Sequence, residues 1–592
     1  MVDYFRQSPA PNPPLRIGIL LDSPKLSAFF ARIIEDIQAS NFAKIELLVY
    51  RKAASPDPLA PPKPAPTSAF GKFAHRFADP KLRKQALYDF YLKLEGRRKI
   101  DNHPLDRVDC SSRFSGIDRL DVEPIGKKFI QRFPPEAIEA IRAKNLDVLL
   151  RFGFNILHGD ILQAARYGVW SYHHGDNDFY RGGPPHFWEI YEGSPLSGVI
   201  LQVLTEELDG GLVLCRSLFA TEATVSAAQN RFVPYWGSTH MVIRKLNELH
   251  RCGWDHIRAN AVPPAPYQGK RKIYRTPGNA DMARWLGPAL LKKAIQSQFR
   301  RETVQHWRIG IRTNGKRLFE SASAPDGAGF RWIEPPKGHF WADPFVIERQ
   351  GKNWMYFEDY SYAKQRALIA CAEITPDGTI LAPKPCIDDP NQHYSYPHVF
   401  WAGNDLFMIP EARSSGRVDL YRCQEFPHKW KPERTLLEGK YVDTTVWQHD
   451  GLWWMAATTA EPASRAGCLL LFYSDSLTGE WHFHPGNPIS TDIRFNRGAG
   501  RVFQHENRWI RPSQSCCPIY GYSFSFNEIT ELSKDRYSER TSLTVTPEVW
   551  KGIRGVHTYN WLGNIELIDG QKTTPLSEVF DPSSRTLSSP AN

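Results

Sequence analysis

Two stretches decide how the first half of this chain folds: Ser171-Tyr172-His173-His174-Gly175-Asp176, continuing to Tyr180-Arg181-Gly182-Gly183, and then Glu206-Glu207-Leu208-Asp209-Gly210-Gly211. Residues 168–173 have the composition of a buried strand, and residues 197–204 form a second apolar run that leads toward Asp209. In doubly wound sheets, ligands bind at the carboxyl ends of strands. We therefore expect His173 and Asp209 to face the same crevice.

The residues on either side alternate between strand and helix patterns. Residues 16–22, 44–50 and 146–153 are short apolar runs, whereas residues 27–38 and 136–144 repeat their apolar positions with helical spacing. This order predicts an α/β domain with a doubly wound parallel sheet. No Gly-x-Gly-x-x-Gly follows the first strand, which argues against a nicotinamide dinucleotide site.

Composition narrows the class of protein. A chain of 592 residues, 41% hydrophobic and 23% charged, is expected to form two or three globular domains. No apolar run is long enough for a membrane span, and residues 1–14 lack the apolar core of a signal peptide, so we expect a cytoplasmic protein without a transmembrane segment. The net charge of +10 is spread without a long basic run, so no nucleic-acid partner is expected. Nine scattered cysteines without a Cys-x-x-Cys pair predict neither a disulfide framework nor a zinc ribbon, and we expect no metal.

The two opening stretches together resemble the folate-dependent formyltransferase family, which includes glycinamide ribonucleotide, methionyl-tRNA and sugar-amine formyltransferases. The family carries Asn-x-His before a Tyr-Arg-Gly turn, and Leu-Asp-x-Gly about one strand later. His173 and Asp209 fall on the histidine and the acid, whereas Ser171 stands at the asparagine position. The resemblance covers roughly residues 16–216.

This resemblance implies a formyl donor, 10-formyltetrahydrofolate, and an amine acceptor, with an amino sugar as our expectation. His173 would polarise the formyl oxygen, Asp209 would pair with it and move the proton, and Ser171 would be a weakened oxyanion donor. The cofactor-binding positions implied by the resemblance are Phe152, Gly153, Phe154, Asn155, Glu207 and Leu208. Two alternatives stay open: a folded but inactive formyltransferase-like domain, and a metal site built from His173, His174, Asp176 and Asp178.

The second half contains a five-fold repeat with a period of about fifty residues. Each repeat opens on an aromatic-rich strand, passes a short polar turn and enters a second apolar strand; the openings start near residues 341, 396, 443, 500 and 557. This pattern predicts a five-bladed β-propeller with four strands per blade. The residues expected to line its central channel are Asp343, Glu358, His398, Glu411, Asp443, Arg501, Arg511 and His557.

Two resemblances bear on the propeller. Trp341-Ala342-Asp343-Pro344-Phe345 resembles the first blade of five-bladed glycoside hydrolases, with His398 in place of the second blade's acid. The whole half is more similar to the propeller of the plant glucosamine inositolphosphorylceramide transferase family, through residues 511–514 and 520–522. Both resemblances imply a glycan or glycolipid partner.

The chain is thus expected to be multidomain. A formyltransferase-like α/β domain spans 15–260 with an insertion at about 51–125, a linker with connecting helices spans 261–325, and a five-bladed β-propeller spans 326–575. Residues 1–14 and 576–592 are expected to be flexible. The leading hypothesis is a folate-dependent N-formyltransferase in glycan or glycolipid biosynthesis. The alternative is a glycoside-active or glycan-binding propeller protein with an inactive formyltransferase-like domain.

Overall fold

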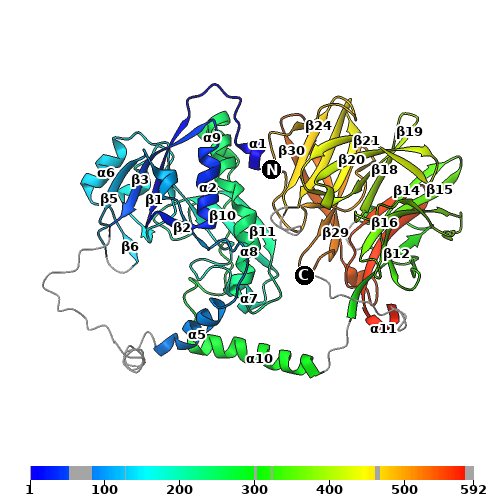
Figure 1. The fold of residues 1–592 in the computed structure, drawn as a ribbon, viewed down its shortest axis with the longest axis horizontal. Helices are drawn as coiled ribbons and strands as arrows, with labels where there is room; N and C mark the ends of the chain where they lie inside the picture. The colour runs from blue at the N-terminus through cyan, green and yellow to red at the C-terminus, as the bar shows by residue number, and fades with distance from the viewer. Residues whose placement is uncertain are drawn as a thin grey trace. The chain divides into compact units, whose positions relative to one another are not determined.

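The chain divides into two units, Met1–Gln298 and Phe299–Asn592. The structure, a computed structural model, describes residues 2–52, 83–126, 129–298, 303–321, 325–460 and 467–579. Figure 1 colours the first unit from blue to green and the second from green to red.

A seven-stranded sheet forms the centre of the first unit. Its strands, in spatial order, are β11 (Leu212–Ala220), β10 (Leu196–Val203), β9 (Val169–His173), β7 (Val148–Arg151), β1 (Leu15–Leu21), β3 (Ala43–Arg51) and β5 (Asp118–Val122). The five strands from β9 to β5 pair in parallel, as predicted. β10 runs antiparallel to both of its neighbours, which the prediction of a parallel sheet did not include. β5 belongs to this sheet although it lies within the predicted insertion.

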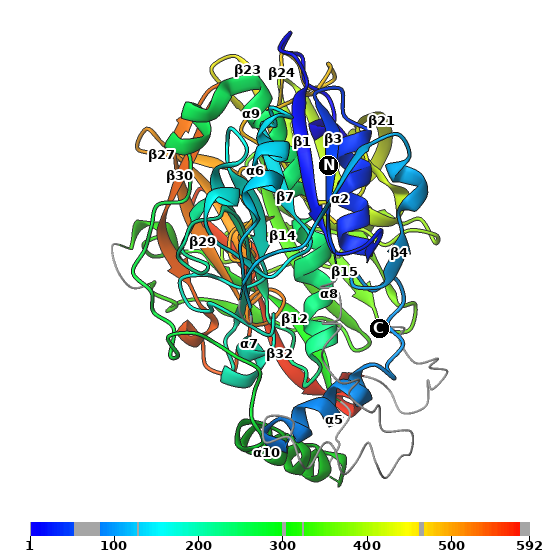
Figure 2. The same cartoon turned by 90° about the vertical axis from the view of Figure 1, so that its left-hand side faces the viewer.

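Helices cover both faces of this sheet, so the doubly wound prediction is confirmed. α2 (Ala28–Gln38), α8 (Ala227–Ser238) and α9 (His240–Ala259) cover one face, and α6 (Pro135–Arg142) packs on the other. Figures 1 and 2 both show α2 running alongside β1 and β3. α2 buries Phe29, Ile33 and Ile37 on one side, since helical positions three to four apart share a face.

The start of α2 provides a test of this local account. The side-chain oxygen of Ser27 accepts a hydrogen bond from the backbone N–H of Phe30 at 3.3 Å and so satisfies a donor that the helix cannot. We expect Ser27→Ala to destabilise the first unit by about 1 kcal/mol in urea unfolding. Ser27→Thr keeps the acceptor and is the control. Equal losses in the two variants would contradict the capping role.

Residues 2–14 pack against the rest of the first unit and form hydrogen bonds with it. α1 (Val2–Phe5) packs on α9, the Ser8 hydroxyl lies 2.7 Å from His250 Nδ1, and the Asn12 amide donates to the His250 carbonyl at 2.6 Å. The prediction of a flexible segment at 1–14 is therefore wrong for the residues that the structure describes. Buried polar partners outweigh the polar, proline-bearing composition of this segment.

An aromatic cluster joins the predicted insertion to the residues predicted as a linker. α5 (Ala86–Glu95) contributes Tyr88 and Tyr91, α7 (Trp188–Glu192) contributes Trp188, and α10 (Asn279–Gln298) contributes Trp285. α10 therefore belongs to the first unit. The proline-rich part of the insertion, at 53–68, lies outside the described residues. The remaining short elements here are β2 (Lys25–Ser27), β4 (Arg107–Asp109), β6 (Ile130–Gln131) and β8 (Ile156–Leu157).

The second unit is a five-bladed β-propeller, as predicted. Three blades are four-stranded sheets of consecutive strands: β14 (His339–Arg349), β15 (Lys352–Ser361), β16 (Arg366–Ile374) and β17 (Lys384–Ile387); β18 (Ser395–Ala402), β19 (Asp405–Glu411), β20 (Arg417–Glu425) and β21 (Lys429–Glu438); β22 (Tyr441–His449), β23 (Leu452–Thr459), β24 (Leu469–Ser474) and β25 (His482–Phe483). The fourth blade contains β26 (Arg497–Gly498), β27 (Phe503–His505), β28 (Arg508–Ser515), β29 (Ser523–Leu532) and β30 (Tyr537–Val545).

The fifth blade is built from both ends of this unit. β12 (Thr303–Arg312) and β13 (Arg331–Ile333) pair with β31 (Tyr559–Leu562) and β32 (Ile565–Pro575) in the order β13-β12-β32-β31. This pairing closes the ring and removes two exposed edges. Arg312 Nε donates to Glu566 at 2.7 Å across the closing strands. The predicted linker at 261–325 therefore ran too far, because β12 lies within it.

Two further findings concern the ends and the membrane. Residues 576–579 form α11 (Leu576–Val579), and the rest of the C-terminal segment predicted to be flexible lies outside the described residues. Among the described residues, no helix is long and apolar enough to cross a bilayer.

Candidate functional site

The first candidate site lies on the face of the sheet that α6 covers. Strand residues alternate between faces, so Val169, Ser171 and His173 share one face of β9. His174 points to the other face, where its ring stacks on Tyr235 at 3.7 Å and burial lowers its pKa well below the ordinary value. The two histidines therefore do not meet at one point, and the structure does not assemble the alternative metal site at this position.

His173 and Asp209 form a buried pair. His173 Nδ1 lies 3.3 Å from an Asp209 carboxylate oxygen, and the exposed fractions of the two side chains are 8% and 13%. The second carboxylate oxygen accepts from the Gly182 backbone N–H at 2.9 Å. Nε2 donates to the Tyr180 carbonyl at 2.7 Å, because a carbonyl only accepts. Both ring nitrogens thus face acceptors, and the two contacts fix the orientation of the ring.

The loop after β10 brings Asp209 to the histidine, rather than a parallel strand end. Because β10 is antiparallel to β9, residues 204–211 must fold back to reach His173. Asp209 has a φ of 54°, in the left-handed region that non-glycine residues rarely adopt. Such strain persists where surrounding contacts hold it, and the carbonyl of Asp209 accepts from the Asn177 amide at 3.3 Å.

Arg151 is the residue of this site that sequence reasoning missed. It ends β7 beside Ser171, and its guanidinium donates to the Ser171 hydroxyl and to the carbonyls of Phe154 and Asn155, each at 3.1 Å. Burial lowers its pKa, while the negative charges of Asp209 and Asp22 oppose that change. These bonds use three of its five N–H groups; the other two donate to no side chain or carbonyl among the described residues, and the charge of Asp209 acts on the guanidinium. An arginine inside a strand otherwise composed of Val-Leu-Leu was the available signal.

Ser171 is committed to its neighbours. Its hydroxyl accepts from Arg151 and donates to the Tyr172 carbonyl at 3.2 Å, and the residue is 2% exposed. Its hydrogen is therefore already used.

The predicted cofactor positions divide into two groups. Phe152 stacks on Phe30 at 4.3 Å and is partly exposed, whereas Phe154 is buried in the core with a φ of 62°. Gly153 is required by packing, since a Cβ there would lie 2.5 Å from the backbone of Asp22. The Asn155 N–H donates to Gln131 at 2.7 Å. Glu207 is exposed and pairs with Arg181 at 2.5 Å, and the adjacent Leu208 is half-buried.

The second candidate site lies in the propeller, where three inner strands bulge at the same place. The pairing register shifts between Ala342 and Phe345, between Ser395 and His398, and between Val442 and Thr445. The residue within each shift has a positive φ: 51° at Asp343, 43° at Tyr396 and 50° at Asp443. Bulges of this kind redirect side chains and are common beside functional sites. The structural equivalent of Asp343 in the second blade is therefore Tyr396, and the alignment of His398 with that position was wrong by two residues.

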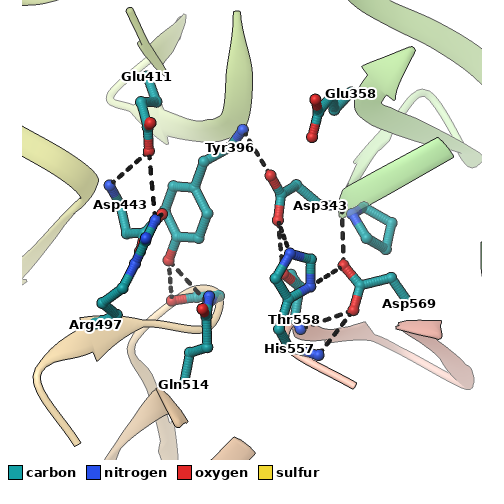
Figure 3. Close-up of polar contacts among 12 residues, drawn as sticks. Asp343, Glu358, Tyr396, Glu411, Asp443, Arg497, Gln514, His557, Thr558 and Asp569 are labelled. Atoms are coloured by element: carbon teal, nitrogen blue, oxygen red, sulfur yellow. Dashed lines mark hydrogen bonds and ion pairs between the residues drawn. The ribbon is translucent and has the colours of Figure 1, made fainter. Parts of the chain in front are cut away.

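Side chains from all five blades converge at these bulges, as Figure 3 shows. They are Asp343 and Glu358, Tyr396 and Glu411, Asp443, Arg497, and, from the fifth blade, His557, Thr558 and Asp569. We call this set the channel cluster. Asp343, Glu358, Glu411, Asp443 and His557 were predicted to lie there; Arg497 and Asp569 were not.

One half of the channel cluster is an ion-paired core. His557 Nδ1 lies 2.6 Å from Asp569, and its Nε2 lies 3.6 Å from Asp343. Burial lowers the pKa of His557, but the two aspartates outweigh it and raise the pKa overall. The oxygens of Asp343 accept from Thr558 Oγ1 at 2.8 Å and from the Tyr396 N–H at 3.0 Å. Asp343 is therefore occupied by internal partners.

In the other half of the channel cluster, two carboxylates, Glu411 and Asp443, lie beside one arginine, Arg497. Arg497 pairs with Asp443 through two nitrogens, at 2.5 and 3.0 Å, while Glu411 lies 3.9 Å from Arg497. Burial and the charge of Asp443 raise the pKa of Glu411 to about 8. Burial and the charge of Asp343 raise the pKa of Glu358 well above its ordinary value. Both shifts favour the protonated forms of these glutamates, and a Glu411 oxygen accepts from the Asp443 N–H at 3.2 Å.

The raised pKa of Glu411 makes stability depend on pH. The unfolded glutamate ionises near 4.5 and the folded one near 8, so between these values the folded state holds a proton that the unfolded state releases. The contribution is fully present below about pH 4.5 and is lost as pH rises toward 8. We expect Glu411→Gln to reduce the drop in propeller stability between pH 5 and 8 by about 2–4 kcal/mol in urea unfolding.

The control for this experiment is Glu373→Gln, which changes a partly exposed partner of Lys352. It should leave the pH profile as in the wild type. Parallel profiles for wild type and Glu411→Gln would contradict a proton held on Glu411.

Three predicted channel residues lie away from the channel cluster. His398 Nε2 lies 3.0 Å from the Val446 carbonyl, and burial, with Arg501 nearby, lowers its pKa to about 3. Arg501 donates to the Val346 and Val399 carbonyls, at 2.9 and 3.0 Å, and thereby ties inner strands together. Arg511 pairs with Glu539 at 2.6 Å within the fourth blade. All three have internal partners.

A separate cleft lies at the amino ends of two strands of the first unit's sheet, whereas the first candidate site lies toward the carboxyl ends. Its volume is about 1140 Å³, and its lining includes Leu15, Arg16 and Asp147, at or next to the amino ends of β1 and β7. Ligands of doubly wound sheets bind at the carboxyl ends, so this cleft is not the first candidate site.

Comparisons with known proteins find two kinds of relative. Residues 334–568 match the family described as glucosamine inositolphosphorylceramide transferase 1, N-terminal. The protein of that name from Arabidopsis thaliana is 31% identical over 250 residues, which are 40% of this chain and 33% of the relative. A methionyl-tRNA formyltransferase from Phenylobacterium zucineum (strain HLK1) is 36% identical over 96 residues, 16% of this chain and 31% of the relative.

Two solved structures are also similar. A glycinamide ribonucleotide transformylase 1 from Symbiobacterium toebii covers 40% of this chain and 87% of its own, with 14% identity and a TM-score of 0.24. An α-L-arabinanase from Cellvibrio cellulosa covers 36% of this chain and 78% of its own, with 10% identity and a TM-score of 0.27. The chain spans about a third of the length of the curated relatives it matches. A formyltransferase-like α/β unit followed by a propeller similar to that of the plant transferases is thus confirmed.

Proposed function

We propose that the first unit is a folate-dependent N-formyltransferase that acts on an amine, and that the propeller binds the glycan or glycolipid carrying that amine. The observation that carries the proposal is the buried His173–Asp209 pair, with the free N–H groups of Arg151 beside it. Similarity to formyltransferases supports the reaction class, and similarity to a glycolipid transferase supports the substrate class.

Formyl transfer needs a donor for the charge that develops on the formyl oxygen. Ser171 has used its hydrogen on Tyr172, and His173 Nε2 has used its own on Tyr180. Arg151 retains two N–H donors and a positive charge in a buried setting, where such a group is worth far more than in water. Arg151 therefore takes over the oxyanion role that the resemblance assigned to the asparagine position.

The reaction also needs a route for the proton of the amine. With 10-formyltetrahydrofolate bound, the amine nitrogen would bond to the formyl carbon, the bond from that carbon to N10 would break, and the proton lost by the amine would end on N10 of the departing tetrahydrofolate. Asp209 accepts this proton, because its carboxylate has acceptor capacity beyond the Gly182 and His173 contacts. The contact with His173 holds the Asp209 carboxylate in place. The half-buried Phe152 ring offers a flat apolar wall for the pterin.

The test is a transfer assay with the full chain. The enzyme is incubated with 10-formyltetrahydrofolate and a panel of amino-sugar nucleotides and amino-sugar lipids, and formylated product is measured by mass spectrometry. The proposal expects a product whose mass rises by one formyl group. Failure with every amine, together with no folate binding, would overturn it.

The internal hydrogen bonds of the first candidate site favour a second function. The Ser171 hydroxyl and His173 Nε2 already have internal partners, which suits a domain that folds without catalysing transfer. In that case the channel cluster carries the function, with Glu358 and Glu411 as neutral hydrogen-bond donors to sugar hydroxyls. Because Asp343 is fully occupied, the geometry favours glycan binding over glycoside cleavage. Sugar release or glycan binding that is lost in Glu411→Ala, without formyl transfer, would select this function.

A further inference from the structure

A second group of chemistry-bearing side chains lies in the propeller, away from the channel cluster. Cys371 on β16, Cys386 on β17 and His428 in the loop between β20 and β21 place their sulfur and nitrogen atoms within 4.8 Å of one another. We call these residues the thiol cluster. They come from two neighbouring blades, and both cysteines are free thiols.

The spacing of the thiol cluster matches the edges of a tetrahedron around one ion. Zinc binds sulfur at about 2.3 Å and histidine nitrogen at about 2.0–2.1 Å, so a tetrahedral site has sulfur–nitrogen edges of about 3.6 Å. The Nδ1 atom of His428 lies 3.3 Å from Cys371 Sγ and 4.0 Å from Cys386 Sγ. These two distances lie on either side of that edge length.

The surroundings hold the ligands in place. Cys423 on β20 belongs to the same hydrophobic cluster as Cys371 and Cys386. The Pro427 carbonyl, next to His428, accepts from Tyr356 at 3.1 Å and from Trp430 at 3.0 Å. These bonds fix the loop that presents the imidazole. Second-shell bonds of this kind orient metal ligands.

We propose that the thiol cluster is a zinc site that joins the two neighbouring blades, with Cys371, Cys386 and His428 as its protein ligands. Soft thiolates with an imidazole in tetrahedral spacing select zinc among common divalent ions. Zinc binding releases the thiol protons. The bound ion then links β16 and β17 of one blade to the loop between β20 and β21 of the next blade. The site does not depend on the proposed transferase function.

The test is the metal content of the full chain, purified without a histidine tag and without chelators. Inductively coupled plasma mass spectrometry should find about one zinc per chain. Cys386→Ser and His428→Ala should each reduce this to below about 0.2. Replacement of zinc by cobalt should produce the intense visible absorption of a tetrahedral thiolate complex, which a surface-bound ion would not.

The matched control is Cys252→Ser, which removes an exposed cysteine of the first unit and should retain the full zinc content. Wild-type protein with less than about 0.2 zinc per chain would overturn the proposal. A low zinc content overturns the proposal both when a thiol assay finds all nine cysteines free and when Cys371 and Cys386 are found joined in a disulfide. The zinc content of the wild-type protein is measured without any variant, so a variant that fails to fold does not affect this outcome.

Discussion

His173→Ala and Asp209→Ala should each lower formyl transfer by about 10²–10⁴-fold while the chain remains folded. The two side chains form one unit, since the Nδ1–carboxylate contact of 3.3 Å holds both in their buried positions. Residues that act as one unit give non-additive losses, so the double variant should be little worse than either single variant. Single-turnover rates and thermal unfolding of the same preparations measure both expectations.

The control pair is His158 and Glu206, a second histidine–acid contact in the same unit. Glu206 lies in the same loop as Asp209 but is 59% exposed. His158→Ala and Glu206→Ala should keep transfer within about threefold of wild type, since an exposed pair contributes little. Normal turnover in His173→Ala, or equal losses in the two pairs, would contradict the assigned roles.

Arg497→Met should destabilise the propeller by about 3–5 kcal/mol. It leaves Asp443, which is 4% exposed, without the guanidinium that now pairs with it at 2.5 and 3.0 Å. A buried carboxylate without a partner costs far more than a lost surface contact. Urea unfolding followed by tryptophan fluorescence measures this loss.

Lys352→Met is the matched comparison, with the same new side chain at an exposed site. Lys352 pairs with Glu373 at 3.0 Å but is 60% exposed, so its loss should cost less than about 1 kcal/mol. If Arg497→Met costs no more than Lys352→Met, the channel cluster is not an electrostatic core.

Local patterns predicted most of the fold. The apolar runs of β1, β3, β7 and β9 and the helical spacing of α2 are signals contained within a few residues. The five-fold repeat was equally direct, because each blade repeats the same aromatic strand. His173 and Asp209 were recognised because the motif that contains them has a fixed order along the chain.

The errors arose where distant residues decide the structure. β12 completes a blade with β32, and its partner strand lies more than 250 residues later in the chain. The equivalence of Tyr396 with Asp343 depends on bulges that only pairing registers show. Arg151, Arg497 and Asp569 gain their importance from neighbours in space. The thiol cluster escaped notice for the same reason, since His428 is 57 and 42 residues from its two cysteines.

The central claim is that the crevice beside His173 is a working folate site. Calorimetric titration of the full chain with 5-formyltetrahydrofolate, a stable analogue of the formyl donor, tests it most directly. We expect one site per chain with a micromolar Kd, corresponding to about −8 kcal/mol. No measurable heat at millimolar ligand would contradict the claim and would leave the channel cluster as the functional site.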